Sequence, residues 1–153
     1  MRIAPLLALG ALAACAHPLI PGTPIPDEPQ NRAVLQVLAN YKQAMEARDA
    51  NALLALAAPE YFDKGDPSRP TDPHDLSGLR RTIPKDFSNV RVLKLDIDIR
   101  NLKIDGDRAQ VDYFGVMRYA IAVPNGEKWL SESDDQRMKF VKIDGDWKIA
   151  SGM

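Results

Sequence analysis

Two side chains of this sequence could carry acid–base chemistry, Asp112 and His74. Asp112 interrupts an otherwise apolar strand pattern, and burial there would shift the pKa of its carboxylate towards a catalytic range. The alternative is a solvated carboxylate paired with Arg91 or Arg137, which we favour because most carboxylates stay exposed. His74 is the only histidine between residues 30 and 153. A single histidine in a loop is usually a surface residue, although its ordinary pKa suits catalysis.

Metal and nucleophile chemistry find little support in the sequence. The densest acidic cluster, "ESDD" at residues 132–135, has no histidine beside it. Zinc sites rely on histidine and cysteine ligands, so we expect neither a metal nor a cofactor. The pentapeptide "KIDGD" occurs at 103–107 and again at 142–146. Neither copy has the spaced ligands of a calcium loop, whereas each has the Asp-Gly of a tight hairpin turn.

The single cysteine, Cys15, ends the segment "LAAC". Residues 1–14 contain one positive charge and an apolar run that is too short for a membrane span, which is typical of a signal peptide. The "LAAC" segment resembles the lipobox of bacterial lipoproteins, and an ordinary signal peptide is the alternative. The resemblance implies lipidation of Cys15 and anchoring at the cell envelope. Because no aspartate follows Cys15, it implies the periplasmic face of the outer membrane.

Residues 15–29 are expected to form a stalk between the lipidated cysteine and one folded domain, residues 30–153. Five prolines in this segment disfavour a helix and favour an extended spacer. The whole chain carries a net charge of −1 and shows no basic patch, so nucleic acid is not an expected partner.

The domain begins with helical periodicity and continues with strands. Apolar residues recur at helical spacing over 31–49, and Asp49 can cap a second helix that Pro59 ends or bends. Residues 63–75 are expected to be a surface loop, and a short helix that follows should stop at Pro84. Beyond residue 86 the period becomes two, with hairpin turns that indicate an antiparallel meander.

This order of elements resembles the nuclear transport factor 2-like superfamily. The segments "VLANYKQAMEARDANALLALAAPEYF" and "MKFVKIDGDWKIASG" carry the resemblance. It implies an α+β fold in which N-terminal helices pack on a curved antiparallel sheet, a cystatin-like cone. It also implies an apolar cavity at the open end of the cone and an outer sheet face that often forms a homodimer. Candidate cavity-lining residues are Tyr41, Tyr61, Tyr113 and Trp129, for which ordinary core packing is the alternative.

From these observations we expect a lipid-anchored extracytoplasmic domain that is not a catalyst. It would bind a small apolar ligand, in a cavity of roughly 300 Å³ or more, or a protein partner at the envelope. One alternative is a cavity enzyme, an isomerase, dehydratase or hydrolase, with Asp112 or His74 as its acid–base residue. Another is a structural envelope lipoprotein that assembles through its sheet face.

Overall fold

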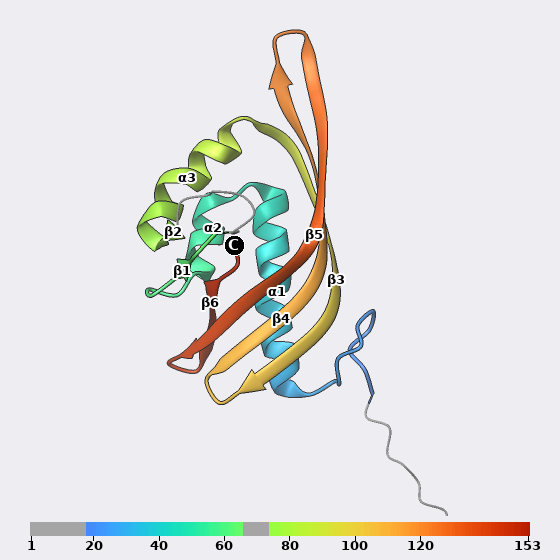
Figure 1. The fold of residues 1–153 in the computed structure, drawn as a ribbon, viewed down its shortest axis with the longest axis vertical. Helices are drawn as coiled ribbons and strands as arrows, with labels where there is room; N and C mark the ends of the chain where they lie inside the picture. Colours follow the sequence, from blue (N-terminus) through green and yellow to red (C-terminus); the bar gives the residue numbers. More distant parts are fainter. Residues whose placement is uncertain (1–17, 66–73) are drawn as a thin grey trace, which may run out of the picture.

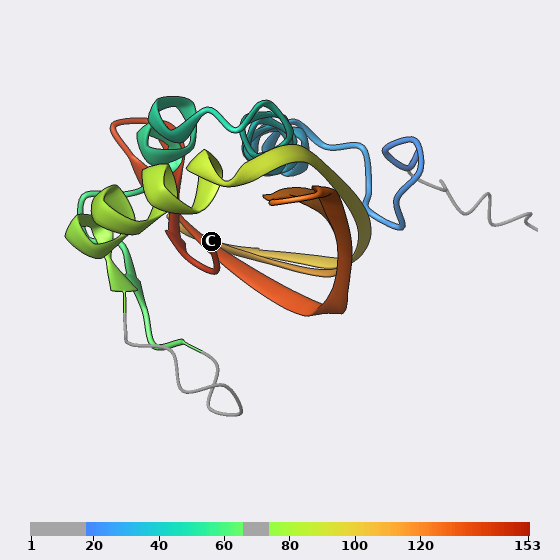
Figure 2. The same cartoon turned by 90° about the horizontal axis from the view of Figure 1, so that it is seen from above.

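Helices lie inside the curve of an antiparallel sheet, as Figures 1 and 2 show from two directions. The computed structural model describes residues 18–65 and 74–153. The strand order in the sheet is β3-β4-β5-β6, so each strand pairs with its neighbour in sequence. This arrangement confirms the predicted α+β architecture. Its main elements are α1 (Pro29–Ala47), α2 (Ala50–Leu56), α3 (Leu76–Ser88), β3 (Val90–Asp105), β4 (Arg108–Val123), β5 (Gly126–Ile143) and β6 (Asp146–Ser151).

The first two helices begin and end where local chemistry predicts. Pro29 is the first residue of α1, where its missing N–H costs nothing. Arg48 ends α1 in the left-handed conformation, and its N–H donates to the carbonyls of Ala44 and Met45. The Asp49 carboxylate then accepts from the Ala52 N–H at 2.9 Å and caps α2, as predicted.

Helix α3 is longer than the sequence predicts, because it continues through Pro84 to Ser88. Leu79, Ile83 and Phe87 recur at a spacing of four and so share one face, which packs against the core. Burial of this face outweighs the single backbone hydrogen bond that Pro84 removes. The prediction that the helix stops at Pro84 was therefore wrong.

The segment expected to be a loop, residues 63–75, includes strand residues. Two short strands, β1 (Phe62–Asp63) and β2 (His74–Asp75), pair antiparallel, with Asp63 opposite His74. The Asp75 carboxylate accepts from the Gly78 N–H at 2.7 Å and so caps α3. This pairing and this cap together hold His74 in a defined place at the start of α3.

The proline-rich segment also differs from expectation. Residues 18–27 fold back into a turn, in which the N–H of Ile20 donates to the carbonyl of Ile25 at 2.8 Å. Ile25 is buried in the core, and this burial favours the turn over an extended spacer. The predicted signal peptide, 1–14, and Cys15 lie outside the described residues. No helix within 18–65 and 74–153 is long and apolar enough to cross a membrane.

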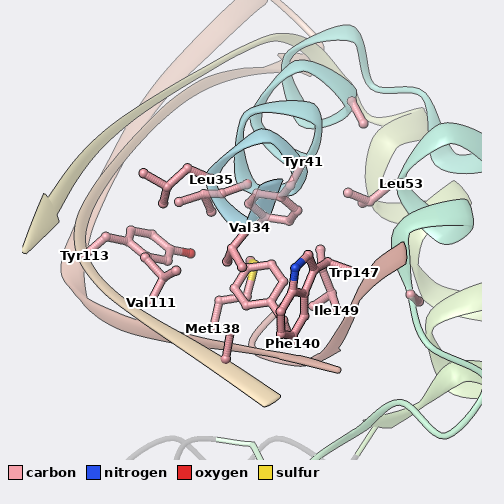
Figure 3. Packing of buried hydrophobic residues seen from close by; sticks show 14 of the residues in the cluster. Val34, Leu35, Tyr41, Leu53, Val111, Tyr113, Met138, Phe140, Trp147 and Ile149 are labelled. Atoms are coloured by element: carbon pink, nitrogen blue, oxygen red, sulfur yellow. The ribbon is translucent and has the colours of Figure 1, made fainter. Parts of the chain in front are cut away.

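The core is concentrated where β6 lies beside β5, and we call this part the closed end. Val111, Met138 and Phe140 project from β4 and β5 towards α1 (Figure 3). Trp147 and Ile149 of β6 are buried in the same cluster. Both copies of "KIDGD" form hairpin corners here, and the Lys142 N–H donates to the Asp107 carbonyl at 2.8 Å. The hairpin prediction for this repeat is confirmed.

Candidate functional site

A cavity of about 530 Å³ lies between α3 and the inner face of β3, β4 and β5. We call this part of the molecule the open end. Strand β5 has 18 residues but β6 has only six, which pair with Lys139–Ile143 of β5. The remainder of β5 therefore extends past β6, and the space between this part of the sheet and α3 is not filled. We define the cavity floor as its buried lining residues: Tyr41, Leu53, Leu79, Ile83 and Leu93.

The floor is apolar except for the phenol of Tyr41. This side chain comes from the middle of α1 and is only 8% exposed. Its hydroxyl makes no hydrogen bond to a described residue, yet no fully enclosed polar side-chain atom in the described chain lacks a partner. Tyr41 is one of the lining residues, so its side chain borders the cavity. Burial, followed by the nearby phenols of Tyr113 and Tyr61, holds the pKa of Tyr41 far above its usual value. The group stays protonated and can donate a hydrogen bond.

The cavity rim, which we define as its exposed lining residues, consists of Asp86, Asn89 and Glu132. The Tyr119 hydroxyl donates to Glu132 Oε1 at 2.8 Å, which orients this carboxylate and raises the pKa of Tyr119. Half-buried His74 also contributes to the wall. Among the lining residues that the structure describes, none is lysine or arginine. The charge of the rim is therefore negative.

The last residues of the chain complete the wall. The Gly152 N–H donates to Asp63 Oδ2 at 2.7 Å, and the Met153 N–H donates to the Tyr61 hydroxyl at 3.1 Å. Gly152 has φ +96, and a Cβ there would lie 2.5 Å from the Arg137 carbonyl oxygen. Burial is the main reason that the pKa of Tyr61 rises to about 12. These contacts hold Met153 in the cavity wall, and Figure 2 shows the chain end inside the ring of elements.

Asp112, the first acid–base candidate, lies on the opposite face of the sheet. Neighbouring Val111 and Tyr113 are buried on the inner face, so alternation along β4 points Asp112 outward. Its carboxylate pairs with Arg137 Nε at 2.7 Å, and this contact, with Asn101 and Gln110, lowers the pKa of Asp112. The structure therefore shows the solvated pair that we favoured, and it removes Asp112 from the cavity.

The other predicted site residues are distributed between cavity, core and surface. His74 and Tyr41 line the cavity. Tyr61 is buried beside the chain end, and Tyr113 is buried in the core with its pKa raised by burial to about 12. Trp129 is 59% exposed and does not line the cavity, because its position on β5 has the opposite phase to inward-facing Glu132.

Several lining residues were missed by sequence reasoning. Asp86 and Phe87 follow Pro84, where the helix was expected to stop. Glu132 belongs to the acidic cluster at 132–135, which was considered only as a metal site, and its pairing with Met117 assigns it to the inner face. Strand alternation assigns Glu132 and Asp112 to opposite faces of the sheet only when the register of β4 on β5 is known. In the described chain, no three His, Cys, Asp or Glu side chains are grouped as a metal site requires.

Comparison with known structures supports the fold. A nuclear transport factor 2-like superfamily protein from Salmonella enterica is similar with a TM-score of 0.67, at 12% identity over 79% of this chain and 86% of that chain. A proposed dehydratase of the same family from Streptomyces avermitilis has a TM-score of 0.65 and 15% identity, over 80% and 92%. A proposed scytalone dehydratase from Novosphingobium aromaticivorans has a TM-score of 0.62 and 16% identity, over 80% of each chain.

No curated protein matches the sequence. The model of the SnoaL-like domain matches residues 34–152, which is most of the chain. The matched range runs from α1 to the end of β6 and so contains every strand of the curved sheet. The chain therefore belongs to the SnoaL-like domain family, and its fold is the one seen in nuclear transport factor 2-like structures.

Proposed function

We propose that the protein binds a small, largely apolar ligand in the cavity of the open end. The observation that carries this proposal is a volume of about 530 Å³ above a floor of buried apolar side chains. This volume lies within the range of roughly 300–1,000 Å³ that small-molecule sites occupy. A ligand that covers this apolar surface removes it from contact with water, and this removal supplies the binding free energy.

Binding without catalysis is the simpler assignment for the floor. The one polar group there, the Tyr41 phenol, keeps its proton because burial raises its pKa. It can orient a ligand as a donor, but it cannot accept a proton near neutral pH. Asp112 lies on the other side of the sheet and has no access to a bound ligand.

The proposed location is the cell envelope, on the periplasmic face of the outer membrane, through a lipid on Cys15. The support is the segment "LAAC" after a short apolar run. Stable anchoring requires more than one acyl chain, and lipidated cysteines of this kind provide that. Labelling with a radioactive fatty acid should mark the protein but not the Cys15→Ser variant. Label retained by the variant would contradict the anchor. A homodimer through the outer sheet face also stays a prediction.

Native mass spectrometry of the protein purified without denaturant tests ligand binding. We expect extra mass that disappears on unfolding. Met117→Trp, which adds bulk to the cavity wall, should lower the occupied fraction. Val116→Trp is the matched control, because the adjacent side chain points to the outer face. Bare protein under all conditions, together with no binding of apolar dyes, would contradict the proposal.

A cavity enzyme that uses His74 is the second candidate. It is favoured by one observation, that the imidazole of His74 belongs to the wall of an otherwise largely apolar cavity. Two similar structures carry the description of dehydratases. If this candidate is correct, wild-type protein converts the released ligand chemically and His74→Gln does not. Unchanged ligand after incubation with wild-type protein would exclude it.

A further inference from the structure

We propose that the ligand is an amphiphilic amine, with its ammonium group at the rim beside Glu132 and Asp86 and its apolar body on the floor. This inference rests on the proposed function and names the class of ligand. It follows from how charge, burial and hydrogen bonding are distributed along the cavity.

The rim attracts cations. Glu132 and Asp86 are its two charged residues, and neither forms an ion pair with a described residue. Lys85 is in the same turn of α3 as Asp86, but it does not line the cavity. An ammonium group between two unpaired carboxylates gains Coulomb attraction, whereas a carboxylate ligand is repelled from the same place.

The end of α3 adds to this preference. Asp86 belongs to the last turn of the 13-residue helix, and Asn89, which follows the helix, is its C-cap. The C-terminal end of a helix carries partial negative charge, which favours cations. Glu132, on β5, lines the same cavity, and the Tyr119 hydroxyl donates to its Oε1 at 2.8 Å. Both sides of the rim therefore present negative charge to one opening.

The floor has features of a built site. The floor includes the phenol of Tyr41, whose hydroxyl makes no hydrogen bond to a described residue and can therefore bind a polar group of a ligand. Three methionines, Met45, Met117 and Met153, also line the cavity. Their flexible, polarisable side chains adapt to varied apolar shapes. The floor thus suits an apolar chain, and the rim selects the charge of its head group.

Displacement of the neutral fluorescent dye N-phenyl-1-naphthylamine from the full-length protein tests the inference. The competitors are decylamine, decanol and decanoate, which share one chain length and differ in charge. We expect decylamine to compete about tenfold better than decanoate, with decanol between them. At 1 M salt the Debye length falls to about 3 Å, so the difference should shrink. Equal competition by the three compounds would overturn the inference while leaving apolar binding intact.

Variants locate the effect at the rim. Glu132→Gln and Asp86→Asn should each weaken competition by decylamine severalfold and leave decanol unchanged. Asp135→Asn is the matched control, because this carboxylate lies on the outer face of the same strand and should change neither. An equal loss for decylamine in the control would show that the preference comes from the overall charge and not from the rim. If the dye and all three compounds fail to bind, the proposed function itself is wrong.

Discussion

The closed end and the open end of the cone are built on the same two strands, β4 and β5. At the closed end Val111, Met138 and Phe140 are at most 2% exposed. At the open end, further along the same inner face of β4 and β5, Met117 and Glu132 border a cavity of about 530 Å³. The inner face therefore changes from filled core to cavity wall without any change in the pairing of β4 with β5.

The elements that pack on the sheet, and not β4 and β5 themselves, decide which end of its inner face is filled. At the closed end β6 adds Trp147 and Ile149 to the side chains of α1. At the open end α3 lies across the sheet without closing the space. Because the closed end is closely packed, we expect it to contribute most of the free energy of unfolding. The open end is less closely packed and so has room for a ligand.

The largest effect is expected at the closed end. Phe140→Ala removes an aromatic side chain that is 2% exposed, and it should lower the free energy of unfolding by about 3–5 kcal/mol. Urea denaturation followed by circular dichroism measures this loss. A loss below about 1 kcal/mol would show that the closed end is not the stable core.

A matched pair of methionines tests the comparison directly. Met138→Ala empties space in a filled region and should cost about 2–5 kcal/mol. Met117→Ala borders space that already exists, so it loses less buried area and should cost less than about 1 kcal/mol. The two variants are compared by the same denaturation experiment. Similar losses would mean that the two ends do not differ in packing.

Gly152 lies at the junction of the two regions. Gly152→Ala should destabilise the protein by about 1–3 kcal/mol, because φ is +96 and a Cβ would meet the Arg137 carbonyl oxygen at 2.5 Å. Movement of neighbouring Met153 should also weaken ligand binding. Gly106→Ala is the control, since its φ is positive but no atom lies within 4 Å of the new Cβ. An equal loss of stability in both variants would show that the contact between the new Cβ and the Arg137 carbonyl oxygen does not contribute to the effect.

The smallest effect is expected on the outer face. Asp112→Asn removes an exposed ion pair with Arg137 and should cost less than about 1 kcal/mol at pH 7, with no change in ligand binding. Arg137 lowers the folded-state pKa of Asp112, so the wild-type contribution is complete above the unfolded pKa of about 4. It is lost as the pH falls through the folded value, and the variant should lack this part of the acid dependence. Urea denaturation of the wild-type protein and of Asp112→Asn at pH 7 and pH 3 measures this difference.

Local signals were enough to predict much of the fold. The stripe of α1, the Asp49 cap and the two "KIDGD" hairpins each depend on residues close in sequence, and the structure confirms them. The passage of α3 through Pro84 and the turn at residues 18–27 could not be predicted in this way. In both places, burial against residues far away in the chain outweighs a local preference.

The candidate site depended far more on tertiary structure. Tyr41 could be named as a cavity candidate because its position in the apolar stripe of α1 points it inward. Whether Asp112 or Glu132 lines the cavity depends on the register of β4 on β5. A shift of one residue exchanges the two faces of a strand. Periodicity and turn chemistry were sufficient to predict helices α1 and α2 and the hairpins, and the resemblance of two segments to a known family indicated the fold. Only the tertiary structure decided where the cavity opens and which carboxylates surround it, because a cavity exists where distant elements fail to meet.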